Sequence, residues 1–85
     1  MKAAKRRKAR HRMARFPRLR EIREELGWEV TQLVAKVPDN KPGISSVYRL
    51  EQGYAIRLTS ARRVFDVVNA ASHGKLDATK ELVVS

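Results

Sequence analysis

The sequence predicts an all-α domain of four to five short helices, preceded by a basic, disordered N-terminal arm. Apolar residues recur at helical spacing in four stretches between residues 19 and 71, and glycine or proline follows each stretch. No stretch alternates convincingly between apolar and polar residues as a half-buried strand does, although the many valines favour strands. Because 85 residues suffice for one small domain, we place that domain at residues 17–85.

Residues 1–16 form the expected arm, and the excess charge lies at this end of the chain. The net charge is +10, and residues 1–20 hold ten basic residues and no acidic one, so the nine basic and nine acidic residues of 21–85 cancel. Such a run repels itself and is typical of segments that bind polyanions, with a solubilising tail as the alternative. The arm residues expected to contact a polyanion are Lys5, Arg6, Arg7, Lys8, Arg10 and Arg12.

The first two helices are marked by apolar stripes and by residues that end helices. Pro17 suits a first helical turn, and the stripe that follows it stops at Gly27. A second stripe begins at Val30 and stops before Pro38, which disfavours a helical residue in front of it. Residues 38–43 (PDNKPG) are rich in proline and glycine and predict a loop.

Three further helices are expected after this loop. The third runs over about residues 43–52, and the fourth begins at Thr59 or Ser60, either of which suits an N-cap. The apolar stripe of the fourth comprises Ala61, Val64, Phe65, Val68 and Ala71. Asp77 is expected to cap a short fifth helix over residues 78–84 (ATKELVV).

The second and third expected helices, with the short turn between them, have the outline of a helix-turn-helix. Further matching features are Arg23, Gly27, Trp28, Leu33 and the stretch RLEQG at residues 49–53. On these features, residues 19–71 resemble the lambda-repressor/Cro (xre) helix-turn-helix family, in its small controller or phage-regulator form. The resemblance implies that the third helix lies in the major groove of DNA.

Three features depart from the family pattern. One is Val34, which stands where the family has Ala for close packing of the helices. The family commonly has Ser or Thr followed by Gln at the start of its second helix, where this sequence has Glu29 and Val30. A glutamate at this position still suits the positive end of the helix dipole. The loop is also about three residues longer than is usual in the family, which is expected either to tilt the third helix or to bring Lys41 to the DNA backbone.

The resemblance assigns roles within the third helix and around it. The positions at which the family reads bases correspond to Ile44, Ser45 and Arg49 in this sequence. An arginine can donate two hydrogen bonds to O6 and N7 of a guanine. The residues expected to contact the DNA backbone are Lys41, Ser46, Tyr48, Gln52 and Arg57. For each of them the alternative is a solvated helix face. Glu51 is expected instead to form a structural ion pair with Arg23 of the first helix, which fixes the angle of the third.

The C-terminal segment supplies apolar residues that we expect at a homodimer interface: Leu76, Leu82 and Val83. Folding of this segment onto the chain's own core is the alternative. Proteins with this motif usually bind DNA as two-fold dimers on half-sites about one helical turn apart.

These features together predict a sequence-specific double-stranded DNA-binding transcriptional regulator, a dimeric repressor or controller. One alternative is an antitoxin or antiactivator that acts mainly through a protein partner and uses the helix-turn-helix for autoregulation. Another is an RNA-binding basic protein, which would need exposed aromatic residues for stacking, and the sequence offers only Tyr48 and Tyr54.

No enzymatic activity, cofactor or metal is expected. The sequence has no cysteine, and His11 and His73 lie far apart without an acidic cluster. It also lacks an acid–base pair, a nucleophile–histidine set and a glycine-rich phosphate loop. No apolar run approaches the roughly 20 residues that a membrane span needs, so we expect an intracellular protein. The family resemblance implies a cytoplasmic, nucleoid-associated protein of a prokaryote or phage.

Overall fold

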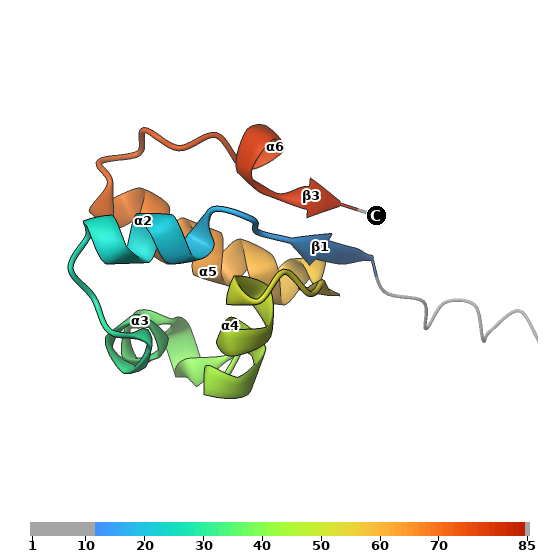
Figure 1. Ribbon diagram of the computed structural model, residues 1–85, viewed down its shortest axis with the longest axis horizontal. Coiled ribbons are helices and arrows are strands. Elements are labelled where there is room, and N and C mark those ends of the chain that lie inside the picture. Colours follow the sequence, from blue (N-terminus) through green and yellow to red (C-terminus); the bar gives the residue numbers. More distant parts are fainter. Residues whose placement is uncertain (1–11, 85) are drawn as a thin grey trace, which may run out of the picture.

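The computed structural model describes residues 12–84, which form five α-helices, one 3-10 turn and three short β-strands (Figure 1). The helices are α2 (Leu19–Glu25), α3 (Val30–Lys36), α4 (Ile44–Glu51), α5 (Leu58–Ala71) and α6 (Ala78–Glu81). The 3-10 turn η1 covers Pro38–Asn40, and the strands are β1 (Met13–Arg15), β2 (Ile56–Arg57) and β3 (Val83–Val84). The fold is mostly helical, as expected, but it includes a small sheet that an all-α class does not.

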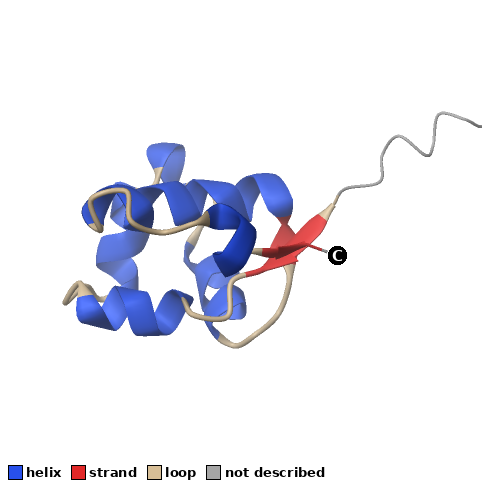
Figure 2. Cartoon of the chain, turned by 90° about the horizontal axis from the view of Figure 1, so that it is seen from above, coloured by secondary structure: helices blue, strands red, loops and turns tan. Residues whose placement is uncertain are grey.

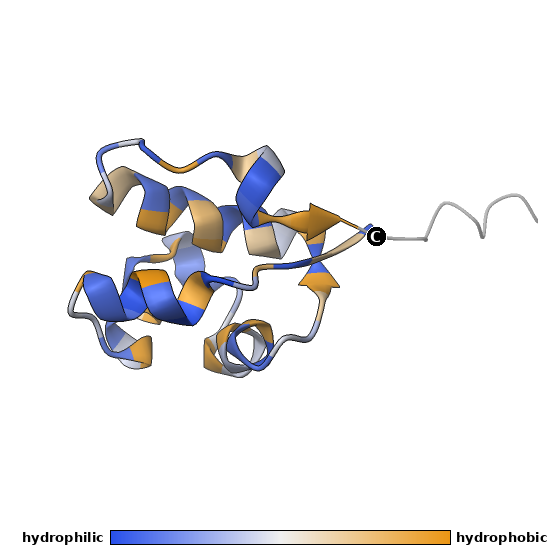
Figure 3. Ribbon diagram, turned by 45° about the horizontal axis from the view of Figure 1, so that its top comes forward, coloured by the Kyte–Doolittle hydropathy of each residue, from blue (hydrophilic) through white to orange (hydrophobic). Residues whose placement is uncertain are grey.

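Helices α2 to α5 bury the apolar stripes that predict them. The inward side chains include Leu19, Ile22, Leu33, Val47, Leu50, Val64, Phe65 and Val68, all of them buried. Figure 3 shows hydrophobic and hydrophilic residues alternating around these helices, as amphipathic helices on one shared core require. The core therefore sits between α2, α3, α4 and α5, which position one another.

The sheet closes one end of this helical body (Figure 2). Its strand order is β2-β1-β3, and β1 pairs antiparallel with both neighbours. The expectation of no strands was wrong because these strands have only two or three residues, too few to display an alternating pattern. The sheet also explains why α5 begins at Leu58 rather than at a Thr59 or Ser60 cap. The backbone N–H of Leu58 donates to the carbonyl of Arg12 at 2.8 Å, which satisfies the first amide of α5, and no side chain caps this helix.

The expected arm extends too far into the domain. Residues 13–16, which we assigned to it, form β1 and the residue after it. Ala14 and Phe16 are both 0% exposed, and the ring of Phe16 lies 5.9 Å from that of Phe65 between centroids. The arm boundary was wrong because apolar side chains two residues apart bury themselves even within a basic segment. Residues 1–11, with the arm residues Lys5, Arg6, Arg7, Lys8 and Arg10, lie outside the described residues.

The C-terminal segment folds onto the same core. Asp77 caps α6 as expected, because its Oδ1 accepts a hydrogen bond from the backbone N–H of Thr79 at 3.0 Å. The helix ends at Glu81, however, and the chain continues as β3, so the predicted helix over 78–84 is too long. The buried carboxylate of Glu81 accepts a hydrogen bond from Arg18 Nη1 at 2.8 Å, which ties α6 to the start of α2.

Candidate nucleic-acid interface

Helices α3 and α4 pack against each other and are joined by residues 37–43, at the lower side of the domain in Figure 1. Within this connection Asp39 and Asn40 have φ angles of 58° and 52°, in the left-handed region that Asp and Asn tolerate better than most residues. They help to turn the chain toward α4, whose N-cap is Gly43 and whose C-cap is Gln52. The observed helix therefore matches the predicted third helix, caps included.

The start of α3 is stabilised in spite of its unusual residues. Glu29 is the N-cap, and its backbone N–H donates to Oε1 of Gln32 at 2.6 Å. This bond satisfies one of the amides that a helix start leaves without an intrahelical partner. The departure from the family pattern at Glu29 thus leaves the helix boundary intact.

The predicted ion pair between Arg23 and Glu51 is present and fixes α4 to α2. Arg23 Nε donates to Glu51 Oε2 at 2.5 Å and Nη2 donates to Oε1 at 3.0 Å, which gives the forked geometry of strong arginine–carboxylate pairs. A third bond runs from Arg23 Nη1 to the carbonyl of Trp28 at 2.8 Å, just before α3. The side chains are 12% and 7% exposed. The hydrogen bonds to Glu51 raise the pKa of Arg23 above its ordinary value, so the guanidinium stays charged.

The Arg23–Glu51 ion pair anchors one side of α4, and the opposite side of the helix is exposed to solvent. Val47 and Leu50 are buried, whereas the residues expected at DNA lie outside the core. Those that are exposed are Ile44, Ser45, Tyr48, Arg49 and Gln52, and Ser46 is half-buried. The periodicity therefore predicted correctly which side of the helix is free.

Tyr54 adds a contact that the sequence did not reveal. The guanidinium carbon of Arg49 lies 5.6 Å from the centroid of the Tyr54 ring, within the range of a cation–π interaction. Gly53, with φ of 97°, reverses the chain after α4, and the backbone N–H of Tyr54 donates to the carbonyl of Arg49 at 2.9 Å. Tyr54 thus holds the end of the Arg49 side chain at the surface. The only sequence signal was the glycine, whose turn geometry needs a positive φ.

A groove of about 460 Å³ runs beside α4, toward β1, β2 and the start of α5. Its polar side chains come from Lys41, Ser46, Arg49, Arg57 and Ser60. The structure therefore brings together three of the expected backbone contacts and one expected base contact, from segments that are separate in sequence. Ser60, which we expected as a helix cap, is instead part of this groove. None of the residues that line it is acidic.

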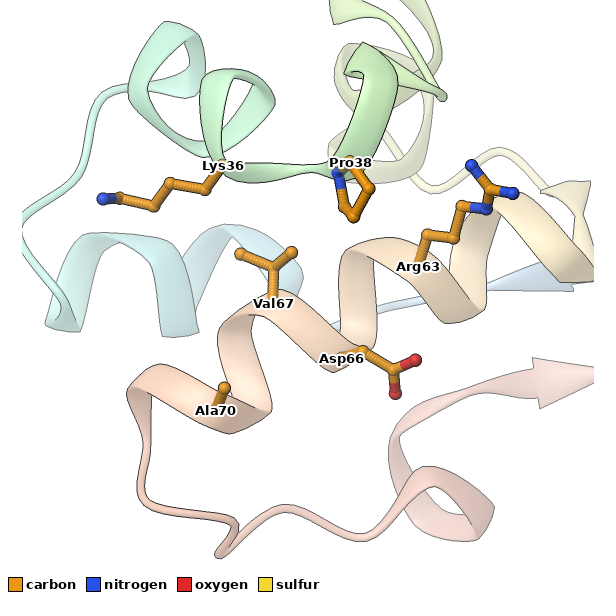
Figure 4. Close-up of a pocket in the computed structure, with 6 residues that line it drawn as sticks. All are labelled: Lys36, Pro38, Arg63, Asp66, Val67 and Ala70. Atoms are coloured by element: carbon orange, nitrogen blue, oxygen red, sulfur yellow. The ribbon is translucent and has the colours of Figure 1, made fainter.

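A second hollow, of about 360 Å³, lies between the end of α3 and α5 (Figure 4). It is lined by Lys36, Pro38, Arg63, Asp66, Val67 and Ala70. Its charges are mixed, and the Lys36 ammonium also lies 5.0 Å from the centroid of the Trp28 ring. This hollow contains none of the residues expected at DNA.

The expected dimer residues do not form one exposed surface. Leu82 is 6% exposed and belongs to the chain's own core, so its assignment to an interface was wrong. Leu76 is partly buried against the same core, whereas Val83 in β3 is exposed. Leu82 lies between α6 and β3, and the antiparallel pairing of β3 with β1 holds this stretch of the chain against the domain.

In comparisons with known proteins, no family model matched the chain, and no curated protein or solved structure showed a significant similarity to it. Among residues 12–84, no group of three or more His, Cys, Asp or Glu side chains is placed to hold a metal ion. Within the same range, none of the helices has the length and apolar character that crossing a bilayer requires.

Proposed function

We propose that the chain is a sequence-specific double-stranded DNA-binding transcriptional regulator whose helix-turn-helix, of the lambda-repressor type, consists of α3, residues 37–43 and α4. The observation that carries this proposal is the arrangement of α4. One side of the helix is anchored by the buried Arg23–Glu51 pair, and the other presents the residues that the resemblance assigns to bases.

The dimensions of α4 suit the major groove. An α-helix with its side chains is about 10–12 Å in diameter, which fits the roughly 12 Å width of the major groove of B-DNA. Ile44 and Ser45 lie in the first turn of α4, where helix-turn-helix proteins touch base edges. Arg49 lies in its last turn, on an exposed side chain long enough to reach a guanine beyond the helix. The proposal therefore gives Ile44, Ser45 and Arg49 the base contacts.

Backbone contacts flank these positions. The groove beside α4 supplies Lys41, Arg57 and the hydroxyl of Ser46, all of which suit phosphate oxygens. Tyr48 and Gln52 are exposed along α4 itself and would reach the opposite wall of the major groove. Phosphate contacts of this kind fix the register of a protein on DNA but carry no sequence information.

Selection of bound sites from a random duplex library tests the proposal. We would compare the full chain with Arg49→Ala and with Lys75→Ala, a control that removes one exposed positive charge from the segment between α5 and α6. That segment lies on the opposite side of the domain from α4 in Figure 1. We expect a motif in which one preferred guanine is lost in Arg49→Ala and retained in Lys75→Ala.

The selected motif also tests the homodimer. A two-fold repeat with half-sites about one helical turn apart would support a dimer, and a single half-site would support a monomer. If no motif emerges from the full chain, the proposal fails. A stable complex with a protein partner would then favour the antitoxin or antiactivator alternative.

A further inference from the structure

The register of the sheet sorts its side chains onto two faces. Directly opposite residues of an antiparallel pair share a face, and successive residues of a strand alternate between faces. Ala14 pairs with Ile56 in β2, and both are buried, so they define the inner face. Met13 pairs with Arg57 on the other side of the same ladder. The outer face, defined as Met13, Arg15, Arg57 and Val83, is therefore directed away from the core.

Two arginines lie close together on this outer face. Met13 lies directly opposite Arg57, and Arg15 is two residues further along β1, so Arg15 is the diagonal neighbour of Arg57. Diagonal neighbours in an antiparallel pair are separated by about 7–8 Å between their backbone positions. Both side chains are exposed, and neither forms an ion pair with a carboxylate of residues 12–84. In contrast, four other arginines form ion pairs with carboxylates. They are Arg18 before α2, Arg20 and Arg23 in α2, and Arg62 in α5. The positive charge of Arg15 and Arg57 is thus not compensated by a carboxylate of residues 12–84.

The outer face is continuous with the groove beside α4. Arg57 belongs to both, and Met13 of β1 also lines the groove. The strip from Arg49 through Lys41 and Arg57 to Arg15 therefore contains four cations. The groove that supplies three of them has no acidic lining residue. Arg12, which is exposed directly before β1, adds a fifth cation at the same end of the domain. Closely spaced, uncompensated cations along a strip match the spaced negative charges of a nucleic-acid backbone.

We propose that the outer face of the sheet is a second phosphate-binding surface, which holds the DNA backbone alongside the major groove read by α4. This inference rests on the proposed function and extends the footprint beyond the helix-turn-helix itself. Arg15 and Arg57 each contact phosphate and do not read bases.

The test is the salt dependence of binding for charge-removing variants. Arg15→Gln, Arg57→Gln and the double variant would be titrated with the selected duplex and with a duplex of unrelated sequence, at several salt concentrations. Each lost phosphate contact lowers the slope of log K against log salt by about 0.9. With equal binding at 1 M salt, a slope that is smaller by about 0.9 makes each single variant bind about fivefold more weakly than the original chain at 150 mM. The double variant should bind about 30-fold more weakly.

Three controls make the result specific. Arg15→Lys and Arg57→Lys keep the charge and should bind nearly as well as the original chain, which separates lost charge from disturbed strand pairing. Lys75→Ala removes a charge elsewhere and should change neither the slope nor the affinity. Circular dichroism of the glutamine variants should show an unchanged melting transition, because both arginines are exposed and form no ion pair within residues 12–84.

The inference is supported if both duplexes lose affinity equally in the glutamine variants while the base preference stays the same. It is overturned if the double variant keeps the full slope while Arg49→Ala still loses its guanine, and in that case the proposed function survives. A change in base preference would also overturn it, since the arginines would then read sequence. Dissociation of a dimer by the double variant, measured by sedimentation, would make the outer face a contact between two copies. If the original chain binds no DNA at all, both the proposed function and this inference fail.

Discussion

Replacement of Glu51 by alanine tests the anchor that sets the position of α4. The change leaves the guanidinium of Arg23, only 12% exposed, without its carboxylate. Removal of one partner from a buried ion pair typically costs about 3–5 kcal/mol, because the remaining charge is uncompensated. Arg23 keeps its hydrogen bond to the Trp28 carbonyl, so we expect the lower end, about 3 kcal/mol.

Urea and thermal denaturation would measure this loss. In a domain of this size, 1 kcal/mol lowers Tm by about 4–8 °C, so Glu51→Ala should lower it by about 12–24 °C. The matched control is Glu24→Ala, which breaks the exposed pair with Arg20 and should cost no more than about 0.5 kcal/mol. A loss below about 1 kcal/mol for Glu51→Ala would refute the reasoning that this pair holds α2 and α4 together.

Three further predictions concern the cap of α6, which the sequence predicted correctly, and two buried residues, which it did not predict. The hydrogen bonds from Thr79 lower the pKa of Asp77 in the folded chain. The ionised carboxylate therefore stabilises the fold above its unfolded pKa, and this contribution is lost as pH falls through the lower folded pKa. In thermal melts from about pH 6 to about pH 2, Asp77→Asn should remove this pH dependence. Phe16→Ala should reduce the free energy of unfolding by about 3–5 kcal/mol, because it leaves a cavity beside Phe65, and an unchanged urea midpoint would contradict the burial of Phe16. Leu82→Ala should cost about 2–5 kcal/mol without changing the sedimentation coefficient, whereas loss of a dimer at unchanged stability would return Leu82 to an interface.

The sequence predicted the features that depend on local periodicity. The inward residues of α4 and α5 repeat at intervals of three and four, and burial of Val47, Leu50, Val64 and Val68 follows directly from that spacing. The Arg23–Glu51 pair was predictable from the family resemblance, because both residues stand at matching positions.

The features that the sequence missed depend on contacts between distant segments. Strand β1 carries only one inward residue, Ala14, so its pairing with β2 and β3 is visible only when all three segments come together. The cation–π contact of Tyr54 with Arg49 depends on the chain reversal at Gly53 rather than on any pattern. Leu82 looked exposed because the sequence does not reveal the pairing of β3 with β1, which joins the two ends of the described chain beside it.

The central claim is that Arg49 reads a guanine in the major groove, and one binding measurement tests it directly. The selected duplex would be compared with a duplex in which 7-deazaguanine replaces the preferred guanine, which removes only the N7 acceptor. Because the O6 acceptor remains, the original chain should lose affinity near the lower end of the value for a bidentate contact, about fivefold or about 1 kcal/mol, and Arg49→Ala should bind both duplexes equally. An equal loss for the original chain and for Arg49→Ala, or no loss for either, would contradict the claim.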